Sequence, residues 1–245
     1  MRKHLAVFGL FVRSSLLRIL ILLGGMILLQ AFLFGYTMHT TFSSENLVWG
    51  LESIITDSRI VFVFALAFLL MTLQLASVGC SHSSQTGYTL SRLCVTPQTV
   101  FLWQAAANTL FYLLLWAAEA STVFAFTQYY AAAVDPSQLS NQTVFLAYYR
   151  STLLHGLMPL DQISIYIRNI VLICGLGTAA AVFPFRQRKK SIGLELYVLV
   201  PLVCIMFPRQ TSEMVGDVFL ILLSAFLMFT ALYSVFTKED ANSES

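Results

Sequence analysis

The residue types that most often perform catalysis or bind metals are few in this chain of 245 residues, and they lie far apart. The cysteines and histidines form neither a CxxC pair nor an HExxH motif, and a GxSxG sequence and a GxxxxGK[ST] phosphate loop are also absent. We therefore expect no enzyme, no cofactor and no metal site. The cysteines are expected to pack as small apolar residues and the histidines to lie at solvated surfaces. They are Cys80, Cys94, Cys174 and Cys204, and His4, His39, His82 and His155.

One carboxylate lies inside a long apolar segment. Glu119 is surrounded by alanine and serine over residues 117–121. A carboxylate at membrane depth normally faces protein or a water-filled cavity, and small neighbours let another helix approach closely. We expect Glu119 to line a translocation path or a helix interface, with a water-accessible boundary position as the alternative. Arg168, at the end of another apolar segment, is expected to extend toward the water boundary.

The composition indicates that the membrane is the solvent of this chain. Hydrophobic residues make up 58% of it and charged residues only 11%, whereas charged residues are about a quarter of a soluble domain. A net charge of +2 provides no broad basic surface, so a nucleic-acid partner is not expected. The fold class we expect is an all-α membrane protein.

Six stretches approach the roughly 20 apolar residues that a membrane-spanning helix requires. We expect six transmembrane helices in one domain, residues 19–236, followed by a cytoplasmic tail, residues 237–245. The fifth stretch is short and contains Glu195 and Pro201, so a kinked or re-entrant segment is the alternative there. The six stretches are 19–36, 60–79, 101–126, 169–185, 192–207 and 218–236.

The lysines and arginines between these stretches predict the orientation, because cytoplasmic loops carry an excess of them. With six spans, ten lie on one side and four on the other. The side with ten is predicted to be cytoplasmic, which places both termini inside a multi-pass protein of the plasma membrane. The ten are Arg2, Lys3, Arg13, Arg18, Arg92, Arg186, Arg188, Lys189, Lys190 and Lys238, and the four are Arg59, Arg150, Arg168 and Arg209.

Two segments outside the spans are also expected to be helical. Residues 1–18 have an amphipathic pattern, with Phe11 and Val12 turned away from a more polar stripe. They are typical of a helix in the inner headgroup layer, and a cytoplasmic extension of the first span is the alternative. Residues 148–168 follow a turn signal at Asp135 and suit a short helix at the outer interface. The polar stripe consists of Arg2, Ala6, Gly9 and Arg13.

The most informative segment, residues 81–116, lies between the second and third spans on the predicted cytoplasmic side. Thr86 and Gly87 can open a short helix, and Thr96 and Pro97 can end it before the chain re-enters the membrane. A few apolar anchors with a charge at the rim suit docking into a groove of another protein. An ordinary hairpin between two helices is the alternative. The anchors are Tyr88, Leu90, Leu93 and Cys94, with Arg92 at the rim.

The order of a spanning helix, the sequence T-G-Y-T-L-x-R-L-x-V-T-P and a helix returning to the membrane resembles the ABC-2 type permease subunits of ATP-binding-cassette transporters. In that family the corresponding segment forms a coupling helix that fits into a cleft of the ATPase subunit. Six spans, internal termini and a basic amphipathic N-terminal helix are also similar to the family. The positions that the resemblance assigns to the coupling segment are Thr86, Gly87, Tyr88, Thr89, Leu90, Arg92, Leu93, Thr96 and Pro97.

The resemblance implies a permease subunit that couples ATP hydrolysis by a separate P-loop ATPase to the movement of a substrate, with export as the expected direction. It also implies a second permease subunit, identical or related, that helps to enclose the path. A different class of protein is the alternative. That class is a non-transporting polytopic membrane protein, such as an immunity, sensor or assembly factor, whose cytoplasmic hairpin binds another partner.

Overall fold

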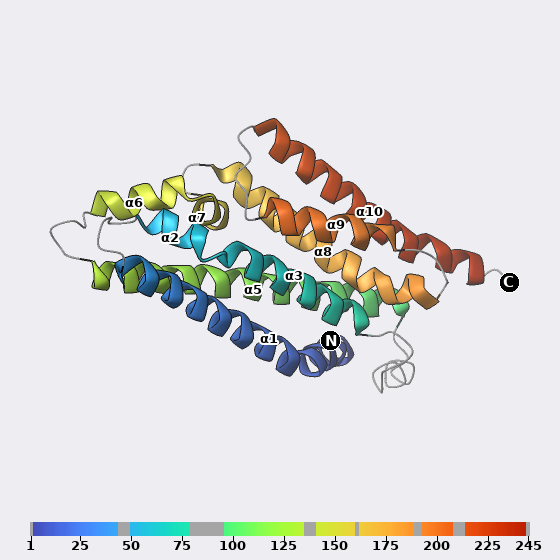
Figure 1. Ribbon diagram of the computed structural model, residues 1–245. Helices are drawn as coiled ribbons and strands as arrows, with labels where there is room; N and C mark the ends of the chain where they lie inside the picture. Colours follow the sequence, from blue (N-terminus) through green and yellow to red (C-terminus); the bar gives the residue numbers. More distant parts are fainter. Residues whose placement is uncertain are drawn as a thin grey trace.

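The computed structural model describes residues 2–43, 50–78, 96–134, 141–159, 162–188, 193–207 and 214–243, and every regular element in these ranges is an α-helix. The expected all-α fold class is therefore confirmed. Five of these helices are long and apolar enough to cross a membrane, and they form an elongated bundle (Figure 1). They are α1 (Arg2–Ser43), α3 (Ile60–Ser77), α5 (Pro97–Ala133), α8 (Ile163–Arg188) and α10 (Met214–Ser243).

The expected fifth span is a short helix. Its helix, α9 (Leu194–Met206), has 13 residues and contains Pro201. At 1.5 Å per residue this is about 20 Å, which is less than the roughly 30 Å of a bilayer's hydrocarbon core. A sixth crossing therefore stays a prediction, whereas the other five stretches coincide with long helices.

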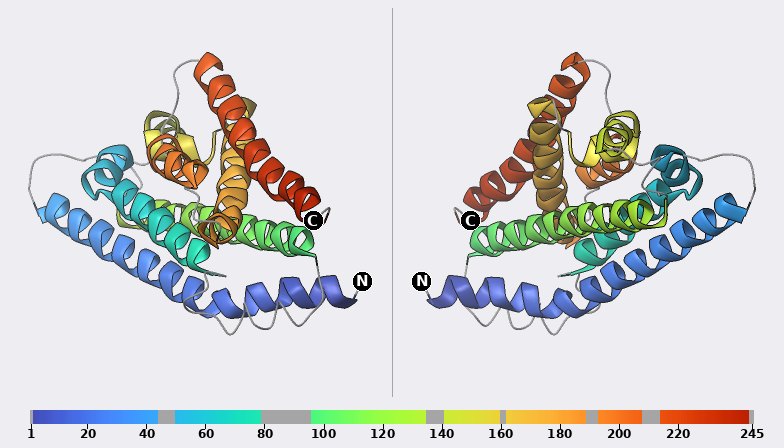
Figure 2. Two further views of the ribbon diagram at one scale, coloured as in Figure 1. Left: turned by 90° about the vertical axis from the view of Figure 1, so that its right-hand side faces the viewer. Right: turned by 90° about the vertical axis from the view of Figure 1, so that its left-hand side faces the viewer.

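Helix α1 joins the expected N-terminal helix to the first span without a break. Figure 2 shows that its first turns lie at an angle to the rest of the helix. Val7 and Phe11 are buried, whereas Ala6, Gly9 and Arg13 are exposed. The predicted separation of an apolar side from a more polar stripe is therefore confirmed for these residues. The continuity of the helix agrees with the extension alternative, and a place in the headgroup layer stays a prediction.

Three short helices gather at one end of the bundle (Figure 1). They are α2 (Leu51–Asp57), α6 (Asn141–Arg150) and α7 (Thr152–Leu157), and α7 confirms the short helix expected within residues 148–168. Both termini, the end of α3 and the start of α5 lie at the opposite end. We call the end with the three short helices the capped end, and the opposite end, where both termini lie, the terminal end.

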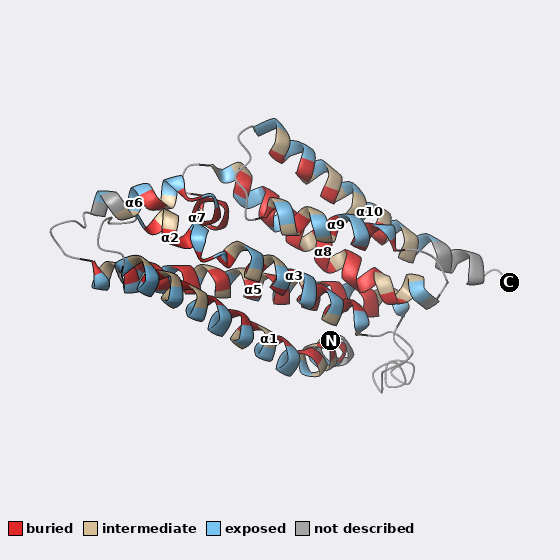
Figure 3. Cartoon of the chain, viewed as in Figure 1, coloured by how far each residue is buried: buried red, intermediate tan, exposed pale blue. Residues whose placement is uncertain are grey.

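Helix α8 lies at the centre of the bundle and packs most extensively against α5 and α10. In its most apolar window 67% of the residues are buried, compared with 22% in α1 and 17% in α10. Figure 3 shows the same contrast, with exposed residues along the outer sides of α1 and α10. Two glycines of α8 allow the neighbouring helices α5 and α10 to approach it closely. A Cβ atom at Gly177 would lie 2.4 Å from Thr109 Oγ1, and one at Gly175 would lie 2.4 Å from Ser224 Oγ.

Candidate functional site

The predicted coupling segment is only partly within the described residues. Positions Thr86, Gly87, Tyr88, Thr89, Leu90, Arg92 and Leu93 lie outside them, and the described part begins at Thr96. Thr96 and Pro97 are exposed at the first turn of α5. Proline is favoured there because the first backbone N–H groups of a helix have no intrahelical acceptor. Helix α5 therefore begins at Pro97, ahead of the span expected from residue 101, whereas the short helix expected to end at Thr96 and Pro97 lies outside the described residues.

Contacts among three helices hold the end of α3 beside the start of α5 at the terminal end. The buried Gln104 of α5 donates a hydrogen bond of 3.1 Å from Nε2 to the carbonyl oxygen of Val78, the residue that follows α3. In α1, the ring of Phe8 contacts Trp103 of α5 edge to face, with the ring centroids 5.7 Å apart. The first turns of α1, the end of α3 and the start of α5 thus form one packed unit. We call this unit the junction platform.

Glu119 lies at an interface between α5 and α1. Its side chain is fully buried, and its Oε2 accepts a hydrogen bond of 2.8 Å from Nε2 of Gln30, which is also fully buried. Among the described residues, neither Oε1 of Glu119 nor Oε1 of Gln30 accepts a hydrogen bond. Phe34 and Phe126 stack beside this pair along the same two helices, with ring centroids 4.5 Å apart. The structure thus places Glu119 between two helices of one chain.

The two predicted site regions are well separated. Glu119 lies 22 positions after Pro97 on α5, which is about 33 Å at 1.5 Å per residue. A direct contact between Glu119 and a protein bound at the junction platform is therefore excluded. Two helices, α5 and α1, contribute to both regions and can transmit an influence from one to the other.

The expectation that Arg168 extends toward water is wrong. Its side chain is fully buried, and Nη1 lies 2.9 Å from Oδ1 of the equally buried Asp217 on α10. Nε and Nη2 also donate to Oδ1 of Asn169, at 3.2 and 3.1 Å. Ser164 donates to Asp217 Oδ2, and Asn169 donates to the carbonyl oxygen of Gly156 in α7. The buried guanidinium of Arg168 is neutralised by Asp217 from another helix, so it does not need to reach the boundary between membrane and water.

Gln30 and Asp217 are functional candidates that the sequence analysis missed. Gln30 is the only amide in the apolar stretch 19–36, and Asp217 directly precedes the stretch 218–236. A polar residue inside or next to a spanning segment is itself a signal, because it needs a protein partner. In the sequence, Gln30 is 89 residues from its partner Glu119, and Asp217 is 49 residues from its partner Arg168.

The expectation of a solvated position is also wrong for His155. This residue belongs to α7, is fully buried, and contacts Tyr149 edge to face with ring centroids 5.5 Å apart. His39 is exposed on α1, as expected. His4 and His82 lie outside the residues whose side chains the structure describes. The cysteines Cys174 and Cys204 are partly buried in the bundle.

A third buried carboxylate lies at the terminal end. Glu195, in the first turn of α9, forms an ion pair with Arg186 near the end of α8. Thr230 of α10 donates a weaker hydrogen bond of 3.4 Å to the same oxygen of Glu195. This carboxylate therefore connects three helices at that end of the bundle.

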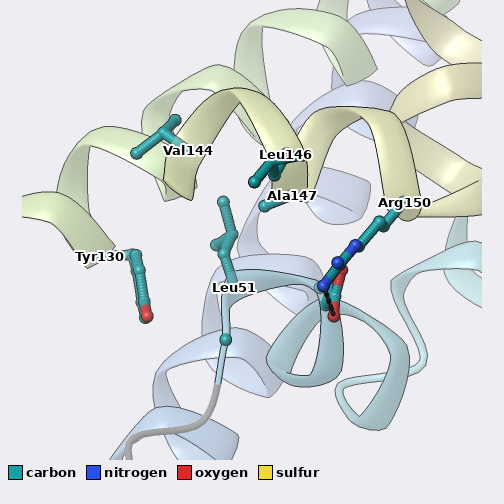
Figure 4. A pocket seen from close by; sticks show the side chains of 8 residues that line it. Leu51, Tyr130, Val144, Leu146, Ala147 and Arg150 are labelled. Atoms are coloured by element: carbon teal, nitrogen blue, oxygen red, sulfur yellow. Dashed lines mark ion pairs between the residues drawn. The ribbon is translucent and has the colours of Figure 1, made fainter. Parts of the chain in front are cut away.

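The capped end contains a small pocket between α2, α5 and α6 (Figure 4). It has a volume of about 140 Å³, and its walls include Leu51, Tyr130 and Ala147. At its edge Arg150 Nη1 lies 3.9 Å from Glu52 Oε1, with both side chains open to solvent. An exposed pair of this kind contributes little to stability. The pocket walls carry no pair of groups arranged as a nucleophile and a base.

Within the described residues, no group of three or more His, Cys, Asp or Glu side chains is arranged to hold a metal ion. The geometry instead provides a junction platform at one end, a buried ion pair at the other and a buried Glu–Gln pair between them. Comparison with protein-family models, curated proteins and solved structures finds no match for this chain.

Proposed function

We propose that this protein is the membrane permease subunit of an ATP-binding-cassette transporter of the ABC-2 type. In this proposal it couples ATP hydrolysis by a separate P-loop ATPase to the export of a substrate across the plasma membrane. The observation that carries the proposal is the junction platform. The two helices that flank the segment resembling a coupling helix, α3 and α5, pack together with α1 at the same end as both termini.

The junction platform suits transmission of movement because α5 begins there and continues as one helix of 37 residues. Helix α5 packs against α8 and α1. A displacement at Thr96 and Pro97 would therefore move a long rigid element past the centre of the bundle. This is the mechanical requirement of a subunit that receives work from an ATPase at one end.

The orientation in this proposal follows from the basic residues. The terminal end carries Arg13 and Arg186, and the run of arginine and lysine at 186–190 begins in the last turn of α8 and continues in the sequence toward α9. Since cytoplasmic segments carry the excess of such residues, the terminal end is assigned to the cytoplasm. The ATPase would then bind on that side, where ATP is present.

A second subunit completes the proposed transporter. The outer sides of α1 and α10 are largely exposed and apolar, so they face either lipid or another membrane subunit. In the proposal the path forms between two such subunits, either two copies of this chain or one copy with a related chain.

The test is purification of the tagged chain from its native membranes, with ATP hydrolysis as the readout. Replacing Leu90 and Leu93 by aspartate should remove a P-loop ATPase from the purified complex and abolish vanadate-sensitive hydrolysis, because apolar anchors dominate the binding of a docked helix. The matched control replaces Ser83 and Ser84 by aspartate. It adds the same charge beside the anchors and should retain the ATPase.

Equal recovery of the ATPase with both double variants would overturn the docking role. Purification without any P-loop ATPase, and without ATP hydrolysis, would favour the alternative of an immunity, sensor or assembly protein. Both variants must appear in the membrane fraction at the level of the parent chain.

A further inference from the structure

A groove runs along α10 at the terminal end of the bundle, beside the end of α8, with a volume of about 410 Å³. Its apolar walls include Phe226, Phe229 and Tyr233, whose side chains are 63%, 64% and 60% exposed. From Phe226 to Thr237 the groove covers about 16 Å of helix at 1.5 Å per residue. This length is close to half of the roughly 30 Å hydrocarbon core, the depth of one lipid leaflet.

The polarity of the groove changes along its length. Phe226 and Phe229 line the part nearer the middle of α10, whereas Ser234 and Thr237 add hydroxyl groups nearer the terminal end. Arg186 of α8 lines the groove as well. Arg186 lies level with Thr230, because both side chains bind the same oxygen of Glu195. An apolar channel along Phe226 and Phe229 that becomes polar and cationic from Thr230 onward matches a phospholipid, with an acyl chain on the apolar part and the charged headgroup beyond it.

The charge near this groove favours an anionic headgroup. Arg186 pairs with Glu195, and the sequence continues with Arg188, Lys189 and Lys190. In the sequence, residues 186–195 therefore contain four cationic residues and one carboxylate, and the structure places Arg186 of this group on the groove. Basic sites between helices at the cytoplasmic face are typical of anionic lipid binding.

We propose that this groove binds an anionic phospholipid of the inner leaflet, with an acyl chain along Phe226 and Phe229 and the phosphate on the Arg186 side. The inference rests on the membrane orientation in the proposed function and does not depend on the ATPase. The groove would make the lipid part of the contact between α8 and α10.

The test places a tryptophan reporter in the groove by Tyr233→Trp and measures quenching by brominated lipids in vesicles. The vesicles contain phosphatidylcholine with 10 mol% of brominated phosphatidylglycerol or of brominated phosphatidylcholine. Quenching of the parent chain, which has three tryptophans, is subtracted. The matched control reporter is Leu73→Trp, which is 59% exposed near the terminal end of α3. We expect at least threefold stronger quenching by phosphatidylglycerol at position 233 and equal quenching by the two lipids at position 73.

Two charge variants sharpen the test. Replacing Arg188, Lys189 and Lys190 by glutamine keeps the Arg186–Glu195 pair. At position 233 it should reduce the ratio of quenching by phosphatidylglycerol to quenching by phosphatidylcholine toward one. The double change Arg186→Gln with Glu195→Gln removes the cation without leaving a buried carboxylate unpaired, and it should also reduce the preference. A preference that survives in both variants would overturn the proposed headgroup site.

Three other outcomes are decisive. Equal quenching by the two lipids at position 233 would overturn the inference while leaving the proposed function intact. The same preference at positions 233 and 73 would show general attraction of anionic lipid to the protein, and would also overturn a site in this groove. A chain that does not float with the vesicles would contradict both the inference and the membrane placement in the proposed function.

Discussion

The two sides of the central helices bury polar residues in different ways. On the side of α8 and α10, the backbones approach closely at Gly175, and the buried Arg168 is matched by a full opposite charge on Asp217. On the side of α1 and α5, large side chains fill the contact, and the buried Glu119 is matched by a neutral amide from Gln30. The comparison predicts that substitutions in the contact between α8 and α10 lower the stability of the fold more than substitutions in α1 do.

The largest effect is expected from Asp217→Ala, which would leave the buried guanidinium of Arg168 without its carboxylate. Loss of one partner of a buried ion pair costs about 3–5 kcal/mol of stability. The midpoint of thermal unfolding in detergent, measured by the loss of the monodisperse chromatographic peak, should fall strongly. The control is Asp57→Ala at the exposed end of α2, which should leave the midpoint unchanged.

The double variant Arg168→Gln with Asp217→Asn removes both charges and keeps hydrogen-bonding groups at the two positions. It should unfold at a higher temperature than Asp217→Ala alone, because no unpaired charge remains buried. If Asp217→Ala unfolds at the parent temperature, the pair does not hold α10 to α8, and the contrast between the two sides is wrong.

A smaller loss is expected from Gly177→Ala. The added Cβ would lie 3.0 Å from the backbone nitrogen of Thr109 in α5 as well as against its hydroxyl, so α8 and α5 must separate. Overpacking of this kind costs about 1–3 kcal/mol. Gly175→Ala should cost less, because the main obstacle there is the side-chain hydroxyl of Ser224.

Gly24→Ala provides the matched control on α1, where no atom lies within 4 Å of the added Cβ. Alanine is favoured over glycine in a helix by about 1 kcal/mol, so this variant should be as stable as the parent or slightly more stable. Equal destabilisation by Gly24→Ala and Gly177→Ala, in the same unfolding assay, would contradict the difference between the close packing of α8 and the looser packing of α1.

The smallest effect on folding is expected from Glu119. Glu119→Leu removes the acceptor of the buried Gln30 amide, and buried hydrogen bonds in membrane bundles contribute about 0.6 kcal/mol on average. Glu119→Gln keeps hydrogen-bonding groups and should fold as the parent does. ATP hydrolysis by the complex in vesicles distinguishes a structural role of Glu119 from a role in the transport path. If Glu119 lines the path, the Glu119→Gln variant should hydrolyse ATP at an altered rate although it folds normally. Parent-like hydrolysis in Glu119→Leu would remove Glu119 from the functional residues.

Local features of the sequence predicted much of the fold. Long apolar stretches mark the five long helices, and the helical spacing of Ala6, Gly9 and Arg13 predicts that Phe11 lies on the buried side of the first turns. These features depend on neighbours in the sequence, so they can be recognised without the tertiary structure.

The pairing of the polar residues could not be predicted in the same way. Arg168 has the sequence pattern of a boundary residue, and only the packing of α10 against α8 brings Asp217 to it. Gln30 similarly meets Glu119 because α1 and α5 pack together. The length of α9 also depends on where the chain turns after α8, which composition alone leaves open.

The most direct test of the proposed function is photocrosslinking from the predicted coupling segment. The photoreactive residue p-benzoylphenylalanine is placed at Tyr88, and as a control at Phe145 of α6, which is 57% exposed at the capped end. After irradiation of intact membranes, we expect a covalent product with a P-loop ATPase from position 88 and none from position 145. Absence of this product at position 88, or equal products at both positions, would contradict the assignment of this chain as an ATP-driven permease subunit.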